Sequence, residues 1–116
     1  GLLRITGRTD DVINRGGNKI NPAVIEDRMM ALGEIQEVAV FGVPGAVYTS
    51  ICAAIVPIAP LDADTYHARC RELLGADAPV MIMHMQQLPR NAAGKVLRHE
   101  LANIALAAAR RQAAPR

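Results

Sequence analysis

A run of six apolar residues near the middle of the chain constrains the fold most strongly. Residues 51–56 read ICAAIV, so both alternating sets of side chains in this run are apolar. A strand with one solvated face alternates apolar and polar residues, whereas a strand buried on both faces reads as a continuous apolar segment. The run therefore predicts a central strand over residues 49–58, with Pro57 near its end.

Pro, Gly and Asn residues divide the rest of the chain into short elements. Asn21 and Pro22 suit the N-cap and first position of a helix that Gly33 ends, and Glu26 and Asp27 are expected close to its positive end. The other expected elements are a strand at residues 3–8, a hairpin with its turn at 15–18, strands at 35–43 and 80–85, helices at 65–74 (capped by Asp62 or Asp64) and 96–111, and a frayed tail at 112–116. We therefore expect an α+β fold: a small sheet of about three core strands covered by helices, preceded by a short N-terminal β-hairpin.

The composition argues against several classes of protein. The length of 116 residues fits one small domain. A formal net charge of +2 is too small to indicate nucleic-acid binding. The chain also has only one Phe, two Tyr and no Trp, and none of these aromatics is interleaved with basic residues to form a stacking surface for bases. The sequence contains no apolar run of transmembrane length and no signal-peptide pattern. We expect no membrane span, a cytoplasmic location, and two reduced, partly buried thiols at Cys52 and Cys70.

The sequence contains no complete catalytic or metal site. The histidines His67, His84 and His99 lack the spacing of zinc ligands, and we expect His67 and His99 on exposed helix faces. Ser50 is the only serine, and it is not in a nucleophile elbow. No Gly-Lys pair is followed by the Ser or Thr of a P-loop. The chain therefore resembles part of a site more than a whole one.

One short stretch near the end of the chain is unusual in its charge and flexibility. Residues 88–98 (LPRNAAGKVLR) contain Lys95, one of only two lysines in the chain. Gly94 allows backbone conformations that other residues avoid, and the small Ala92 and Ala93 leave room for a ligand. A lysine in this place is able to meet a carboxylate or phosphate as a point charge. From this stretch alone, a solvated turn lysine is the simpler interpretation.

A second stretch, at the other end of the chain, changes that interpretation. Residues 7–26 (GRTDDVINRGGNKINPAVIE) resemble the motif that joins the two domains of the AMP-forming acyl-CoA synthetases, a superfamily that includes peptide-synthetase adenylation domains and beetle luciferases. Residues 89–98 resemble the C-terminal lysine loop of the same superfamily. The separation of the two motifs and the strand expected between them also fit, so the resemblance covers essentially the whole chain.

The resemblance implies a role for five residues. Lys95 matches the lysine that contacts the carboxylate and phosphate oxygens during adenylation. Arg8 matches the arginine near the adenylate ribose, and Asp10 matches the hinge about which the small domain rotates. Gly17 matches the glycine that lines the pantetheine channel, and Lys19 matches a basic position that meets a CoA phosphate.

The resemblance also implies what the whole enzyme does. The family uses ATP to convert a carboxylic acid into an acyl-adenylate and then transfers the acyl group to the thiol of CoA, so ATP and CoA are the implied co-substrates. Residues 1–116 would form the C-terminal lid domain, with its hinge near Asp10. A large N-terminal domain, absent from this chain, would hold the ATP loop, the acid pocket and Mg²⁺. The isolated chain is therefore expected to be inactive, and its first residues read as the middle of a strand in a longer protein.

Other interpretations stay open on the sequence alone. The chain could be the small subdomain of a peptide-synthetase adenylation domain that serves a carrier protein, or an interaction module without catalytic role. Arg8 could pair with a nearby Asp on the surface, Gly17 could serve only its turn, and Lys19 could be merely solvated. The sequence departs from the family pattern at residues 47–50 (VYTS), where a Gly-Glu pair is usual, and at residues 77–79 (DAP), where a Lys-Val-Pro turn is usual.

Overall fold

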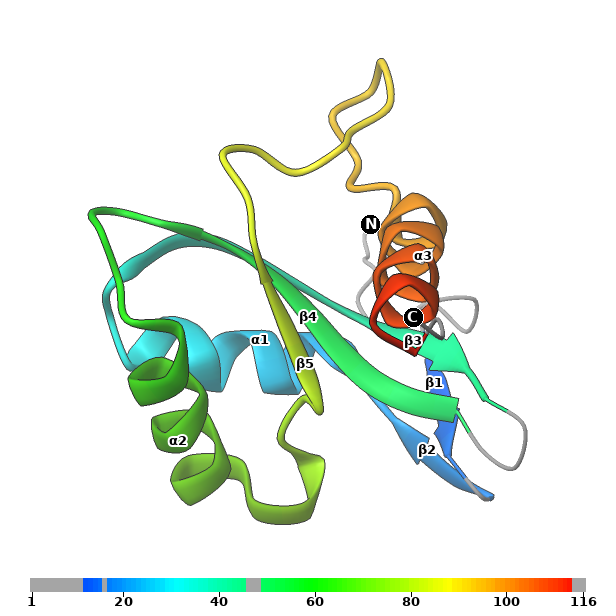
Figure 1. The fold of residues 1–116 in the computed structure, drawn as a ribbon, viewed down its shortest axis with the longest axis horizontal. Coiled ribbons are helices and arrows are strands. Elements are labelled where there is room, and N and C mark those ends of the chain that lie inside the picture. Colours follow the sequence, from blue (N-terminus) through cyan, green and yellow to red (C-terminus); the bar gives the residue numbers. More distant parts are fainter. Residues whose placement is uncertain (1–11, 16, 46–48, 114–116) are drawn as a thin grey trace, which may run out of the picture.

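The computed structural model describes residues 12–15, 17–45 and 49–113, which form an α+β fold (Figure 1). In chain order the elements are β1 (Ile13–Arg15), β2 (Asn18–Ile20), α1 (Pro22–Ala31), β3 (Ile35–Pro44), β4 (Thr49–Pro57), α2 (Ala63–Leu74), the short 3-10 helix η2 (Gly75–Asp77), β5 (Met81–His84) and α3 (Arg98–Ala113). The predicted hairpin, three core strands and three helices are confirmed. The strand expected at residues 3–8 lies outside the described residues.

The main sheet has the order β3-β4-β5, so β4 is central as its apolar run predicted. β3 pairs with β4 in antiparallel register, for example Val40 opposite Ala53. β5 pairs with the other side of β4 in parallel, and α2 supplies the crossover connection that parallel neighbours need. β1 and β2 form a separate antiparallel hairpin, with Asn14 opposite Lys19.

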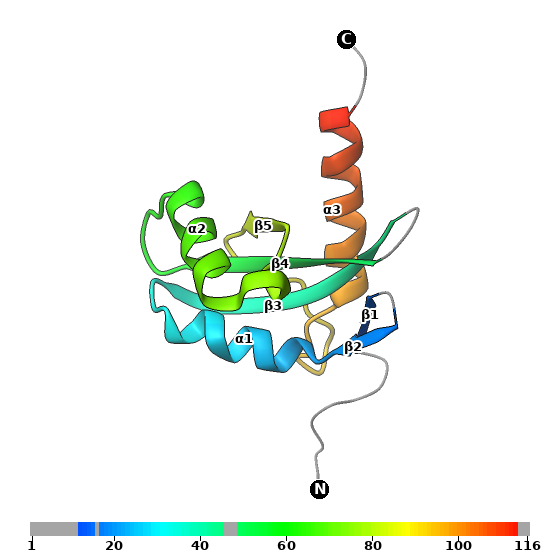
Figure 2. The same ribbon diagram turned by 90° about the horizontal axis from the view of Figure 1, so that it is seen from below.

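The two faces of the main sheet bury two apolar clusters. One face packs against α1, α2 and the hairpin; its buried members are Ile13, Ile25, Met29, Ile35, Val40, Ile51, Ala53, Ile55, Tyr66 and Cys70. The other face packs against α3 and the segment after β5; its buried members are Ala39, Phe41, Cys52, Ala54, Val56, Leu88, Leu101 and Ala105. The β4 residues alternate between the two clusters, which explains why the strand reads as continuously apolar. The C-terminal turns of α3 extend beyond the sheet (Figure 2).

The expected caps form at the helix ends. The Asn21 side chain accepts a hydrogen bond from the Ala23 N–H (3.0 Å) at the start of α1, and Asp62, rather than Asp64, caps α2 by accepting from the Thr65 N–H (2.9 Å). Gly33 follows α1 with φ +74°, a conformation that suits glycine at a helix C-terminus.

Three details of the sequence interpretation are wrong. Glu26 does not serve the positive end of α1, because it lies beyond the first turn and its carboxylate binds the Val40 N–H and Arg98 instead. His67 is not on a freely exposed helix face: it is half-buried, with Nε2 2.7 Å from the Pro79 carbonyl oxygen. The last helix continues to Ala113, so residues 112 and 113 belong to the helix and not to the expected tail.

Candidate functional site

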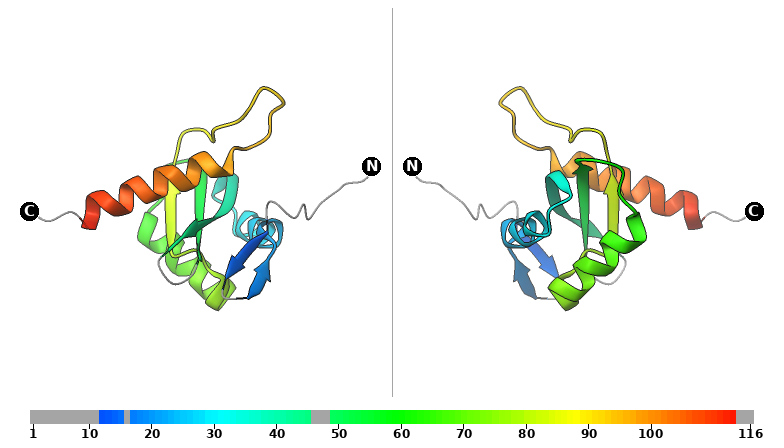
Figure 3. Two further views of the ribbon diagram at one scale, coloured as in Figure 1. Left: turned by 90° about the vertical axis from the view of Figure 1, so that its right-hand side faces the viewer. Right: turned by 90° about the vertical axis from the view of Figure 1, so that its left-hand side faces the viewer.

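The lysine loop, which we define as residues 88–97, is a narrow hairpin that projects from the body of the domain (Figures 1 and 3). Apolar contacts hold its base: Leu88 is buried, and Val96 packs on the same apolar cluster. The Leu97 N–H donates to the Pro89 carbonyl oxygen at 2.9 Å, and Arg90 forms an isolated antiparallel bridge with Val96. The loop is therefore anchored at its base, while residues 91–94 are exposed.

The tip of the lysine loop is fixed by hydrogen bonds to Asn91. The Asn91 side-chain oxygen accepts from the Ala93 N–H (2.9 Å) and from the Lys95 N–H (3.0 Å), while the Gly94 N–H donates to the Asn91 carbonyl oxygen at 2.9 Å. Gly94 has φ +88°, which only glycine adopts without strain, and a Cβ there would meet nothing within 4 Å. The glycine is thus required by the turn, and open space surrounds the tip.

Arg90 connects this tip to the main sheet. Its Nη1 donates to the Gly94 carbonyl oxygen at 2.8 Å, and its Nη2 pairs with Glu37 near the start of β3. Glu37 follows a register irregularity in the β3–β4 pairing. One guanidinium therefore spans from the residue before Lys95 to the edge of the sheet.

The Lys95 side chain is half-buried, and no carboxylate among the described residues pairs with its ammonium. Arginines make all the ion pairs recorded in the described part of the chain. An ammonium without an internal partner, on a loop whose backbone is held by hydrogen bonds, is available to an anionic ligand. The location of Lys95 thus fits the sequence prediction, although its catalytic role stays a prediction.

The β1–β2 hairpin carries the other two predicted site residues that can be located, Gly17 and Lys19. Gly17 has φ +88°, and an added Cβ would meet nothing within 4 Å. Its N–H donates to the Asn14 side chain at 3.2 Å. Lys19 is exposed, and no described residue pairs with its ammonium. Arg8 and Asp10 lie outside the described residues.

Polar and apolar contacts hold the hairpin against the rest of the domain. Arg15 donates from Nη1 to the Ala76 carbonyl oxygen (2.9 Å) and from Nη2 to the Asp77 carboxylate (3.0 Å), both in η2. Ile13 packs against β3 at Gly42, where an added Cβ would lie only 3.2 Å from Ile13 Cγ2. Asp77 belongs to the turn in which the sequence departs from the family pattern. Sequence reasoning placed the hairpin but did not find these contacts.

The structure does not bring the lysine loop and the hairpin together. The lysine loop projects at one end of the domain and the hairpin lies toward the other (Figures 1 and 3). The lysine loop and the hairpin are therefore separate parts of the domain surface.

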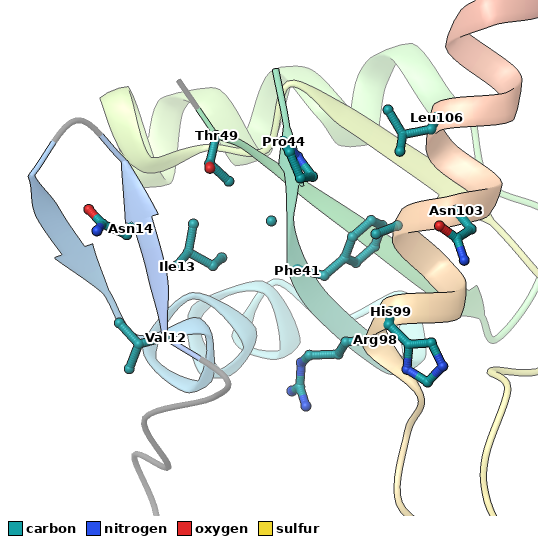
Figure 4. A pocket seen from close by; sticks show the side chains of 12 residues that line it. Val12, Ile13, Asn14, Phe41, Pro44, Thr49, Arg98, His99, Asn103 and Leu106 are labelled. Carbon is teal, nitrogen blue, oxygen red and sulfur yellow. The ribbon is translucent and has the colours of Figure 1, made fainter. Parts of the chain in front are cut away.

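An open pocket of about 450 Å³ lies between the hairpin and α3 (Figure 4). Val12 and Ile13 line it on the hairpin side, and Arg98 and His99 line it on the α3 side. Lys95 and Gly17 are not among its lining residues. The pocket is therefore a different part of the molecule from the two predicted contact sites.

The cysteines are unsuited to nucleophilic chemistry. Both are buried and free in the structure, so they are more buried than the sequence analysis expected. Burial raises the pKa of Cys52 to about 11, above its ordinary 9.0, so the reactive thiolate is scarce at neutral pH. Among the described residues, no group of three His, Cys, Asp or Glu could hold a metal ion, and no helix in that part of the chain is long and apolar enough to cross a membrane.

Comparisons with known proteins show to which family the chain is similar. Residues 24–95 match the family model of the AMP-binding enzyme C-terminal domain. The chain is 31% identical over 106 residues to oxalate–CoA ligase of Saccharomyces cerevisiae, covering 88% of this chain and 20% of that protein. It is 33% identical over 108 residues to 2-succinylbenzoate–CoA ligase of Geobacillus kaustophilus, covering 90% and 22%.

The solved structure of apo MatB from Rhodopseudomonas palustris superposes with a TM-score of 0.75 at 30% identity, covering 87% of this chain and 21% of that one. The chain thus spans about a fifth of the length of these proteins. The match to the family model extends from α1 into the lysine loop. It therefore includes the exposed tip of the loop and the strand β3 that supports it. The chain belongs to the family of C-terminal domains of AMP-forming acyl-CoA ligases.

Proposed function

We propose that this chain is the mobile lid of an AMP-forming carboxylate–CoA ligase, working behind a large N-terminal domain with a hinge near Asp10. The observation that supports this most is the exposed Gly94 tip followed by Lys95, whose ammonium has no partner among the described residues. The named relatives are CoA ligases, which favours CoA over a carrier protein as the thiol acceptor.

Lys95 acts in the first half-reaction. An oxygen of the substrate carboxylate attacks the α-phosphorus of ATP, the bond to the bridging oxygen breaks, and pyrophosphate leaves. Negative charge builds on the phosphate oxygens in the transition state, and a fixed ammonium stabilises that charge without reorganising. Arg8 contacts the ribose of the resulting acyl-adenylate. Mg²⁺ would be held by the large domain, where it would neutralise phosphate charge.

The hairpin acts in the second half-reaction, after the lid has turned. The CoA sulfur attacks the acyl carbonyl carbon, the carbon–oxygen bond to AMP breaks, and the thiol proton passes to water. Gly17 keeps the pantetheine path free of side chains, and Lys19 meets a CoA phosphate. The separation of lysine loop and hairpin on the domain supports this alternation, because each half-reaction then requires its own orientation of the lid.

The activity itself is tested with the full-length protein that contains this chain. Pyrophosphate release from ATP is measured with acetate, oxalate, benzoate and 2-succinylbenzoate, and acyl-CoA formation is measured with the acid that is activated. We expect acid-dependent pyrophosphate release, acyl transfer to free CoA, and neither activity from the 116 residues alone. Robust turnover by the isolated chain, or acyl transfer to a carrier protein but not to CoA, would contradict the proposal.

A further inference from the structure

We propose that two arginines are positioning residues, each for a different half-reaction. Arg90 orients the lysine loop for adenylation, and Arg15 orients the hairpin for thiol transfer. This inference rests on the proposed function, and it adds residues to which no role is assigned. Each arginine uses its two terminal nitrogens to join a projecting element to a distant part of the domain. Neither arginine is itself required to touch the reacting atoms.

The first step of the argument concerns the lysine loop. Asn91 fixes the internal shape of the tip, but its hydrogen bonds stay within the loop. Apart from the apolar contacts at the base, Arg90 joins the tip to the sheet in the described part of the chain. Its guanidinium donates to the Gly94 carbonyl oxygen and pairs with the Glu37 carboxylate. Arg90 therefore sets the orientation of the residue before Lys95 relative to the sheet.

The second step concerns the hairpin, which is a separate two-stranded unit. Ile13 packs one end of β1 on the core, and Arg15, at the other end of β1, binds both the Ala76 carbonyl oxygen and Asp77. Gly17 follows two residues after Arg15 at the turn. Arg15 therefore holds the turn end of the hairpin against η2.

The third step separates positioning from stability. The Arg90 and Glu37 side chains are 42% and 31% exposed, and those of Arg15 and Asp77 are 26% and 54% exposed. Ion pairs with this exposure contribute little to folding, because water screens them. A third pair, Arg69 with Glu34, has similar exposure but joins α2 to the segment before β3, away from both projecting elements. It provides a matched control.

The test uses the two half-reactions of the full-length protein: pyrophosphate release from ATP and the acid that the wild type activates, and acyl-CoA formation from supplied acyl-adenylate. Arg90→Ala and Glu37→Ala should each slow adenylation about tenfold, because small misplacements of a catalytic group are costly, and should spare thiol transfer. Arg15→Ala and Asp77→Lys should each slow acyl-CoA formation about tenfold and should spare adenylation. Glu37 and Asp77 lie off the lysine loop and the hairpin, so their variants report positioning rather than lost ligand contacts.

Arg69→Ala should leave both half-reactions unchanged, and the five variants should have similar melting temperatures. Amide hydrogen exchange of the 116-residue chain adds a readout without substrate: Arg90→Ala should speed exchange at Gly94 and Lys95 but not in β4. The inference would be overturned if the Arg90 or Arg15 variants slowed both half-reactions equally or left both unchanged, as Arg69→Ala should. It would also be overturned if Arg90→Ala sped amide exchange in β4 as much as at Gly94 and Lys95. If Lys95→Ala removes adenylation while Arg90→Ala and Arg15→Ala act like the control, only the positioning roles fail. If Lys95→Ala spares adenylation, the proposed function fails and the inference fails with it.

Discussion

Glu26 and Arg98 form a half-buried ion pair across the open edge of β3, with Arg98 Nη2 2.7 Å from Glu26 Oε2. The same Glu26 oxygen accepts from the Val40 N–H at 2.8 Å, and Arg98 Nε donates to the Val40 carbonyl oxygen at 3.0 Å. Among the described strands, β3 has a partner on one side only. The pair thus satisfies backbone groups on the free side of β3 and joins α1, β3 and the start of α3.

We predict that this pair contributes measurably to stability, unlike the exposed pairs. Glu26→Ala should lower the free energy of unfolding of the chain by about 1.5–3 kcal/mol, because it removes charged hydrogen bonds from half-buried partners. Glu26→Gln keeps an acceptor for Val40 and should cost about 1 kcal/mol. Urea unfolding followed by circular dichroism measures both. Arg69→Ala, which removes an exposed pair, is the control; an effect of Glu26→Ala as small as that of Arg69→Ala would contradict the assignment.

The second prediction concerns the glycine on which the hairpin rests. A Cβ at Gly42 would lie 2.8 Å from Thr49 Cγ2 and 3.2 Å from Ile13 Cγ2. Gly42→Ala should therefore displace the hairpin and destabilise the chain by about 1–3 kcal/mol through overpacking. Adding Thr49→Ser removes the closer methyl group and should restore part of the loss, as measured by urea unfolding. If the double variant is no more stable than Gly42→Ala, crowding at Thr49 is not the cause.

The third prediction concerns alkaline pH. Burial raises the pKa of Cys52 from 9.0 to about 11, and it also raises the pKa values of Tyr66 and Cys70. The unfolded thiols ionise first, so stability that is present below pH 9 is lost as the pH rises toward 11. Cys52 alone should account for up to about 2 kcal/mol of this loss. Cys52→Ala should make the decline of unfolding free energy over this range shallower; an unchanged slope would contradict the assignment.

The sequence predicted the secondary structure well because its signals are local. The apolar run at residues 51–56 placed the central strand, and Asn21, Gly33 and Asp62 marked helix ends by their own backbone chemistry. The contacts that position the site could not be predicted, because they join residues 53 to 72 positions apart and depend on the tertiary fold. Glu26 shows this directly: its location in the helix suggested an interaction with the helix end, whereas the fold places it beside Arg98 and Val40.

The fourth prediction concerns the hairpin turn in the full-length protein. Gly17→Leu should slow acyl-CoA formation from supplied acyl-adenylate and spare adenylation, because a long side chain would block the thiol path. Gly17→Ala imposes the same cost of positive φ without the long side chain, so it separates strain from blockage. We expect Gly17→Ala to retain most of the thiol step; if both variants lose it equally, backbone strain explains the loss.

The most direct test of the central claim is Lys95→Ala in the full-length protein, measured in each half-reaction separately. Removing one positioned charge from a transition state typically costs about a hundredfold or more in rate. We expect pyrophosphate release to fall by about that factor and acyl-CoA formation from supplied acyl-adenylate to stay near the wild-type rate. Equal loss in the two half-reactions, or no loss in adenylation, would contradict the role of Lys95 and with it the account of this domain as an alternating lid.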